Sequence, residues 1–224
     1  MKKVLIVANW KSNKTIKQTE EWFMAVKNGL SDKKFGFDNK EIIIAPSFIS
    51  LEHSKYCIKK LLLPFKLAAQ NISNFDEGPY TGEVNGKQLN ELADFVLIGH
   101  SERRKNFGET DQICSKKVDL ALKYGLKPIY FIQSKESPVP GGVEVVAYEP
   151  VFSVGTGIPD TPENANRVAN SVKLKNNNKL TVIYGGSVMP ENVNGFTSKE
   201  DLDGIIVGGA SLDPLKFIRI VENA

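Results

Sequence analysis

Five polar side chains follow directly after short apolar segments of the sequence, and they are Asn9, Lys11, His100, Glu102 and Glu149. A partly desolvated carboxylate such as Glu149 can act as a base for a carbon acid. An imidazole at the start of a short helix stays neutral and can donate a hydrogen bond to a carbonyl oxygen. A lysine attracts and neutralises an anion. If these side chains line one cavity, they are suited to proton abstraction next to a carbonyl group.

Two glycine pairs follow two later apolar segments, as Gly185–Gly186 and Gly208–Gly209. The second pair stands at the start of the final predicted helix, and Ser187 follows the first pair. Backbone amides in such positions can bind a phosphate dianion. Together with the base, the imidazole and the lysine, these amides indicate enolisation of a small phosphorylated carbonyl compound.

Each of these features also has an ordinary interpretation. Taken alone, Lys11 is a solvated charge, His100 a hydrogen-bonded structural residue and Glu149 the partner of a lysine. A single glycine pair is a common turn. The other histidine, His53, lies in a helical, charged stretch, and we interpret it as a structural or surface residue. The catalytic interpretation therefore depends on a fold that brings these positions to one cavity.

Short apolar segments alternate with amphipathic helical stretches along the whole sequence. Eight segments are apolar throughout, which is typical of parallel strands covered on both faces, and they are 4–8, 42–45, 67–69, 95–98, 128–132, 144–148, 180–184 and 204–207. The clearest helical stretches are 19–30, 112–124 and 162–175, the last preceded by Thr161 as a helix-capping residue. Eight such units predict an α/β fold, a closed (β/α)8 barrel formed by residues 1–224 as a single domain. The residues that follow its strands would then share one end of the barrel.

One connection breaks this pattern. Between the fifth and sixth segments stands only QSKESPVPGGV, in which two prolines and two glycines prevent a stable helix. We therefore expect the helix between strands five and six to be missing or replaced by a short loop. The apolar strip near residues 134–143 would need cover from that loop, a flanking helix or another subunit.

Composition excludes several classes of protein. The 224 residues include 29 Lys and Arg against 26 Asp and Glu, and the basic residues are scattered, which gives no support to nucleic-acid binding. The two cysteines are too few for a disulfide framework and are not spaced as a metal pair, so we expect a reducing, cytoplasmic location. The apolar run near the start is too short for a signal peptide, and no segment is long enough to cross a membrane, so we expect a soluble protein.

The sequence resembles the triosephosphate isomerase family. The motifs that carry the resemblance occur in the family's order from the first strand to the last helix, as ANWK (8–11), AAQN (68–71), YTGEV (80–84), IGHSERR (98–104), AYEPVFSVGTG (147–157), YGGSV (184–188) and DGIIVGGASL (203–212). The resemblance implies a (β/α)8 barrel that interconverts dihydroxyacetone phosphate and glyceraldehyde 3-phosphate through an enediolate, in glycolysis and gluconeogenesis. It implies neither a cofactor nor a metal.

The resemblance also implies a role for each site residue. Glu149 is similar to the catalytic base, His100 to the neutral electrophile and Lys11 to the electrostatic clamp. Asn9 would make a second polar contact to the substrate, and Glu102 would orient Lys11 before substrate binds. The amides implied to bind phosphate are those of Gly155, Ser187, Gly208 and Gly209.

A mobile lid after Glu149 is a further implication. Its hinge residues would be Pro150, Val151 and Phe152 on one side and Ile158, Pro159 and Asp160 on the other. On closure, the Tyr184 hydroxyl would meet the backbone near Asp160, and Ser187 would meet Gly157. The sequence departs from the family where Phe152 replaces a usual tryptophan, where Pro159 enters the hinge, and where Phe131 replaces a common cysteine.

The resemblance also implies an oligomer, and two other functions remain as alternatives. In the family, the loop at 80–84 inserts into a neighbouring subunit, with Thr81 reaching Asn9 and Lys11 of the partner subunit, so we expect at least a dimer. The strip near 134–143 makes a tetramer an alternative. The alternative functions are a barrel that binds phosphorylated ligands without turnover and a different sugar-phosphate isomerase or epimerase. The GHSERR and YEPV motifs disfavour the latter, and the intact Lys11, His100 and Glu149 disfavour the former.

Overall fold

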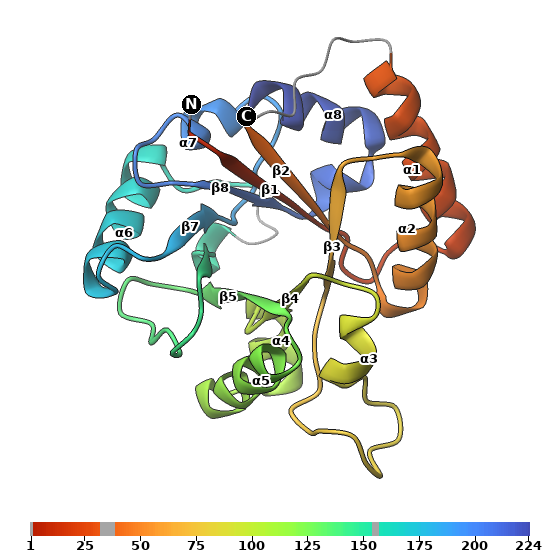
Figure 1. Ribbon diagram of the computed structural model, residues 1–224. Helices are drawn as coiled ribbons and strands as arrows, with labels where there is room; N and C mark the ends of the chain where they lie inside the picture. The colour runs from red at the N-terminus through yellow and green to blue at the C-terminus, as the bar shows by residue number, and fades with distance from the viewer. Residues whose placement is uncertain (1, 32–38, 154–156) are drawn as a thin grey trace.

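The computed structural model describes residues 2–31, 39–153 and 157–224. Within these residues, eight strands close into a parallel barrel in which each strand pairs with the next and β8 pairs with β1 (Figure 1). The strands are β1 (Val4–Asn9), β2 (Lys40–Ala45), β3 (Phe65–Ala69), β4 (Phe95–Ile98), β5 (Lys127–Ile132), β6 (Val145–Tyr148), β7 (Thr181–Tyr184) and β8 (Gly204–Val207). Each predicted apolar segment overlaps one of them, so the predicted (β/α)8 fold is confirmed.

Helices surround the barrel (Figure 1). They are α1 (Ile16–Ser31), α2 (Phe48–Leu61), α3 (Gly86–Asn90), α4 (Ser101–Phe107), α5 (Asp111–Lys123), α6 (Pro162–Lys175), α7 (Val193–Thr197) and α8 (Pro214–Asn223), with short 3-10 turns η1 (Val151–Ser153) and η2 (Gly209–Leu212). The Thr161 hydroxyl accepts a hydrogen bond from the Asn164 amide at 3.2 Å, which confirms the predicted cap of α6. Among the described residues, every helix is too short or too polar to cross a membrane.

The apolar strands serve two separate cores, because successive side chains of a strand point to opposite faces. In β1, Leu5 and Val7 point into the barrel, whereas Val4, Ile6 and Ala8 pack against the helices. The same alternation runs through β6, where Val145 and Ala147 point inward. A strand segment covered on both faces therefore has no polar positions, as residues 4–8 of β1 show.

This alternation also delivers the polar residues to one place. One step beyond Val7 along the inner face lies Asn9, and one step beyond Ala147 lies Glu149. Glu149 continues the strand ladder, since its backbone N–H donates to the carbonyl of Ile132 at 2.8 Å. The inner face of the barrel is thus apolar along its length and polar where the strands end.

The connection between β5 and β6 contains no helix, as predicted, but it leaves no apolar strip exposed. Ile132 and Val146, on the outer face of the two strands, are fully buried, and Val143 from the connection packs into the same core. Gly142, with φ of 80°, lies so close to α5 that an added Cβ would stand 2.6 Å from Cδ1 of Leu122. Of the covers expected for this strip, the connection itself therefore supplies one, because it packs against α5.

Barrel closure depends on a close approach between the first and last strands. Gly204 of β8 pairs with Leu5 of β1, and a Cβ atom at Gly204 would stand 1.9 Å from the Leu5 carbonyl oxygen. A rotation of a side chain cannot relieve this overlap, because the atoms that the Cβ would meet belong to the backbone of Leu5. Only glycine allows the two strands to meet in this register.

We therefore expect Gly204→Ala to lower the free energy of unfolding by about 3 kcal/mol or more, since the backbone must shift to admit the methyl group. Gly141→Ala is the matched control, because a Cβ atom there would meet no atom within 4 Å. Urea unfolding followed by circular dichroism measures both variants. Equal unfolding midpoints for the two variants would contradict this account of barrel closure.

Candidate active site

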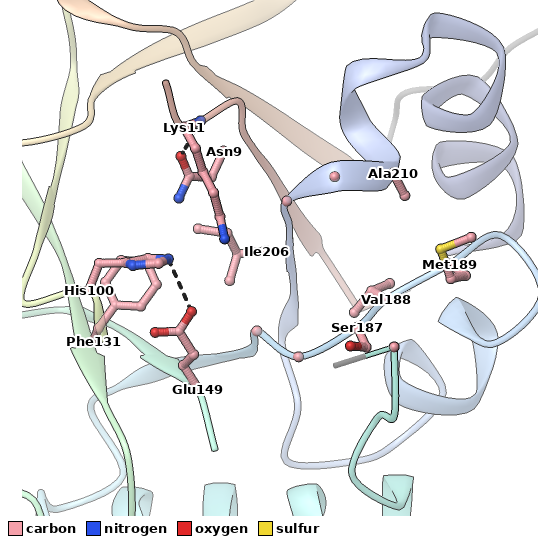
Figure 2. Close-up of a pocket in the computed structure, with 15 residues that line it drawn as sticks. Asn9, Lys11, His100, Phe131, Glu149, Ser187, Val188, Met189, Ile206 and Ala210 are labelled. Carbon is pink, nitrogen blue, oxygen red and sulfur yellow. Dashed lines mark hydrogen bonds and ion pairs between the residues drawn. The ribbon is translucent and has the colours of Figure 1, made fainter. Parts of the chain in front are cut away.

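A cavity of about 250 Å³ opens at the carboxyl ends of the strands. Its lining residues are Asn9, Lys11, His100, Phe131, Glu149, Gly157, Gly185, Gly186, Ser187, Val188, Met189, Ile206, Gly208, Gly209 and Ala210. Figure 2 shows His100 and Glu149 on one side and Ser187 with Met189 across the cavity. The structure therefore brings the described residues predicted from the strand ends to one place, with Glu102 joined to them through Lys11.

His100 caps the start of α4, and its two ring nitrogens have different partners. Nδ1 accepts a hydrogen bond from the backbone N–H of Glu102 at 3.2 Å. A nitrogen that accepts an amide hydrogen carries no proton, so the proton of the neutral ring lies on Nε2. Nε2 stands 3.0 Å from Oε1 of Glu149 and donates to it (Figure 2). The geometry thus gives an uncharged imidazole whose N–H points into the cavity.

The local backbone explains how His100 reaches this position. Val96 and Ile98 of β4 pack on the outer face of the barrel, so a continued strand would place His100 there as well. Gly99 has φ of 79°, which ends the extended conformation one residue before the histidine. A side chain at Gly99 would also meet Arg104 at 3.0 Å. The glycine of the GHSERR motif is therefore a requirement of the turn.

The Glu149 carboxylate is buried, with only 4% of the residue exposed. Its Oε2 accepts the backbone N–H of Ser101 at 3.0 Å, while Oε1 accepts Nε2–H of His100. Burial raises the pKa of Glu149, but the hydrogen bonds from His100 and Ser101 outweigh it and hold the pKa below its usual value. The carboxylate is therefore ionised in this arrangement, and it can accept a proton once these donors are replaced.

Lys11 adopts a backbone conformation that is rare for a side-chain-bearing residue, with φ of 53°. Two contacts hold it, because the Lys11 N–H donates to Oδ1 of Asn9 at 3.0 Å and Nε2 of Gln70 donates to the Lys11 carbonyl at 2.8 Å. Its ammonium donates to Oε1 of Glu102 at 2.5 Å. A Cβ atom at Gly208 would lie 3.3 Å from Cε of Lys11, so the glycine leaves room for the lysine. The strained backbone of Lys11 thus directs its ammonium group toward the cavity.

Ser187, Gly208 and Gly209 line the cavity together with Val188, Met189 and Ala210. Gly209 begins η2, and a Cβ atom there would meet nothing within 4 Å, so open space lies beside its backbone. Ser187 has φ of 48°, in the left-handed region, and its hydroxyl is engaged elsewhere. These backbone groups suit an anion better than an apolar ligand. Gly155, the remaining residue expected to bind phosphate, lies outside the described residues.

The segment after Glu149 begins with Pro150 and the turn η1, and the expected hinge residues lie at its two ends. The side chains of Val151, Phe152 and Ile158 are largely exposed. Pro159 directly precedes Asp160 in the expected second hinge.

One of the two expected latch contacts is present. The hydroxyl of Tyr184 accepts the Asp160 amide hydrogen at 2.7 Å, as predicted. Ser187 does not pair with Gly157 as expected, because its hydroxyl donates to the carbonyl of Ser153 at 2.7 Å. The Ser153 hydroxyl in turn donates to the Pro150 carbonyl, which ties the first hinge to the wall of the cavity.

Several supporting residues escaped the sequence interpretation. Gln70 lies within the AAQN motif, but the motif gives no sign of its hydrogen bond to the Lys11 carbonyl. A buried charge cluster behind α4 gave no sequence signal, because Arg103 and Lys117 come from different helices to reach Glu109. Burial raises the pKa of Glu109, but its hydrogen bonds with Lys117 and Arg103 outweigh that effect and lower it. The cluster fixes α4, which carries both Ser101 and Glu102.

The second histidine is not among the residues that line the cavity. His53 lies on α2, with Nε2 at 3.8 Å from Oε2 of Glu20 and its ring stacked on Tyr56. This placement agrees with the structural interpretation of His53. No cluster of three or more His, Cys, Asp or Glu side chains suited to a metal ion occurs in the part of the chain that the structure describes.

Comparison with known proteins gives a consistent result. Residues 4–224 match a family model described as triosephosphate isomerase. The chain is 38% identical over 251 residues to the triosephosphate isomerase of Aquifex aeolicus, covering 98% of both chains. It is 37% identical over 247 residues to that of Mesomycoplasma hyopneumoniae and 38% identical over 257 residues to that of Dictyoglomus thermophilum, with 100% of each chain covered.

We expect His100→Leu to raise the pKa of Glu149, because the variant removes one of its two donors and leaves the burial. Carboxyl resonances of 13C-labelled glutamate, titrated by NMR, measure this pKa. The Glu149 resonance is assigned by its loss in Glu149→Gln. His53→Leu is the control, since it removes the other histidine and should leave the pKa of Glu149 low. A pKa that stays low in His100→Leu would contradict the role given to this hydrogen bond.

Proposed function

The chain belongs to the triosephosphate isomerase family, and we propose that Glu149 and His100 carry out its reaction, the interconversion of dihydroxyacetone phosphate and D-glyceraldehyde 3-phosphate. One observation supports this assignment most. A buried carboxylate and a neutral imidazole lie 3.0 Å apart in a cavity that is also lined by Ser187, Gly208 and Gly209. A base, a hydrogen-bond donor and an anion-binding wall are the three parts that enolisation of a triose phosphate needs.

In the proposed mechanism, the Glu149 carboxylate removes a proton from the carbon next to the substrate carbonyl. The electrons of the broken C–H bond form the C–C double bond, and the carbonyl oxygen becomes the enediolate oxygen. Nε2–H of His100 stabilises the charge on that oxygen, with Lys11 and Asn9 as further polar partners. The hydroxyl proton of the carbon that was deprotonated then moves to the former carbonyl oxygen, so that the enediolate charge lies on the other oxygen. Glu149 returns its proton to the former carbonyl carbon, and the second oxygen becomes the new carbonyl, which yields the isomer without net change in the enzyme.

Substrate binding makes Glu149 a stronger base. In the empty site, the same N–H of His100 that would bind the substrate oxygen is donated to Glu149. When the substrate oxygen takes over that donor, and the carboxylate leaves the Ser101 amide to reach the carbon, burial is the main influence left on its pKa. Since burial raises the pKa of a carboxyl group, the base gains proton affinity at the moment it is needed.

We propose that the segment between the two hinges closes over this site. Its first hinge is tied to the site by Ser153 and Ser187, and its second by Asp160 and Tyr184. Closure would exclude water and so protect the enediolate from loss of phosphate. The amide of Gly155 would complete the phosphate site.

We further propose a homodimer in the cytoplasm. The loop between β3 and α3 projects from the barrel at the bottom of Figure 1, and Thr81 belongs to this loop. Asp76 holds this loop against the end of α5, where hydrogen bonds from Lys123 and Tyr124 lower the pKa of Asp76 to about 2. Beside Lys11, a second cavity bordered by exposed Phe48 and Phe107 suits the loop tip of the partner subunit.

The cytoplasmic location rests on Cys57 and Cys114, which are free and buried.

Glu149→Asp moves the carboxylate back by about 1 Å, and we expect it to lower kcat by about 10²-fold or more. We expect His100→Gln to lower kcat by about 10²-fold or more as well, because this variant removes the neutral N–H donor from the substrate oxygen. Both variants should keep the circular dichroism spectrum of the parent. A coupled assay of glyceraldehyde 3-phosphate isomerisation measures kcat, with His53→Gln as the matched histidine control.

Absence of isomerisation by the parent protein would contradict the proposed roles. If the parent still binds 2-phosphoglycolate under those conditions, the chain is a phosphate-binding barrel without turnover. If the parent is active and 2-phosphoglycolate competes with substrate, the enediolate mechanism is supported, because this compound mimics that intermediate.

For the assembly, we expect sedimentation velocity at micromolar concentration to give a dimer. Thr81→Arg should shift the protein toward monomer, because a bulky charge at the loop tip would be buried on association. Asn194→Arg, an equal change at an exposed position on α7, should leave the dimer intact. A parent protein that sediments as a monomer would overturn the dimer proposal.

A further inference from the structure

Phe131 lines the active-site cavity but has no part in the mechanism described so far. It lies on β5, faces the inside of the barrel and is only 1% exposed. Its ring centroid stands 4.8 Å from that of His100, with an angle of 64° between the ring planes. Figure 2 shows the two rings against each other on the side of the cavity that also holds Glu149.

The barrel leaves a space that a large side chain at this position fills. Phe131 pairs in register with Ala147 of β6, whose methyl group occupies little of the inner face. Glu149 follows Ala147 on that face. The Phe131 ring is therefore located where it can contact His100 and border the cavity without displacing the carboxylate.

His100 needs such a contact because one of its two hydrogen bonds is temporary. The bond from Nε2 to Glu149 must break when the substrate oxygen becomes the acceptor. The bond from the Glu102 amide to Nδ1 then remains, and it leaves the imidazole free to tilt about the line through that hydrogen. A ring packed at a steep angle against the imidazole opposes this tilt.

We propose that Phe131 is a positioning residue that holds the imidazole plane of His100, so that Nε2–H points at the substrate carbonyl oxygen after Glu149 has moved. The inference rests on the proposed role of His100 in the isomerase reaction. It assigns Phe131 an effect on the transition state rather than on substrate affinity. Removal of the ring should therefore lower kcat more than it changes KM.

The first measurement compares two phenylalanines of the inner core. Phe131→Leu should lower kcat by about 10-fold or more through misaligned donation, with KM changed by less than about 3-fold. Phe95→Leu is the matched control, because Phe95 is also a buried inner-core residue, on β4, but does not line the cavity. It should leave kcat within about 2-fold of the parent while also creating a core cavity. Phe131→Met, whose unbranched and flexible side chain adapts to an irregular space, serves where the leucine variant does not fold.

The second measurement separates positioning from general packing by a double-mutant cycle with His100→Gln. If Phe131 acts through the imidazole, Phe131→Leu has no further effect on kcat once the imidazole is gone. Equal losses of kcat in Phe131→Leu and Phe95→Leu, or multiplicative losses in the cycle, would overturn the proposal.

A third readout does not depend on turnover. Relaxation of the His100 ring, measured by NMR on 15N- and 13C-labelled histidine in the 2-phosphoglycolate complex, should show a larger ring amplitude in Phe131→Leu than in the parent or Phe95→Leu. Unchanged relaxation would overturn the positioning role. Full activity of His100→Gln would instead contradict the proposed function, and the relaxation result would still decide whether Phe131 orients the ring.

Discussion

A buried carboxylate keeps its charge in this barrel because a neutral imidazole and a backbone amide donate hydrogen bonds to it. The rest of the site depends on that arrangement. The Glu102 amide fixes which nitrogen of His100 carries the proton, and the charge cluster around Glu109 fixes the helix that supplies the amide. If the donors were absent, burial would raise the pKa of Glu149 and favour its protonated form, which cannot accept a proton. The binding of substrate is therefore coupled to the proton affinity of Glu149, because the substrate replaces the carboxylate as the acceptor of the His100 hydrogen bond.

Much of this architecture could be predicted from the sequence, because barrel strands have a simple pattern. Uninterrupted apolar segments indicate strands covered on both faces, and eight of them indicate closure. The strand-end positions then locate Asn9, His100 and Glu149 in one cavity. Individual contacts could not be predicted in this way. The positive φ of Lys11 with its support from Gln70, and the ring contact between Phe131 and His100, depend on distances between strands that no sequence spacing gives.

The connection from β5 to β6 shows how the barrel covers its outer wall where a helix is missing. From the sequence, the cover could come from a loop, a flanking helix or another subunit. The structure shows that a connection without regular structure can bury the same surface, because Val143 packs into the outer core and Gly142 fits against Leu122. Lys175 at the end of α6 adds a salt bridge to Glu136 of the connection at 2.6 Å. The connection between β5 and β6 thus lacks a helix but still covers the outer wall of the barrel.

The central claim is that an occupied site changes the partners of Glu149 and thereby raises its proton affinity. The most direct measurement is the 13C carboxyl shift of Glu149 at neutral pH, recorded before and after addition of 2-phosphoglycolate. The account predicts an ionised carboxylate in the free protein and a shift toward the protonated form in the complex, because the ligand displaces the Ser101 and His100 donors. A carboxylate that remains fully ionised in the saturated complex, still hydrogen-bonded to Ser101, would contradict it.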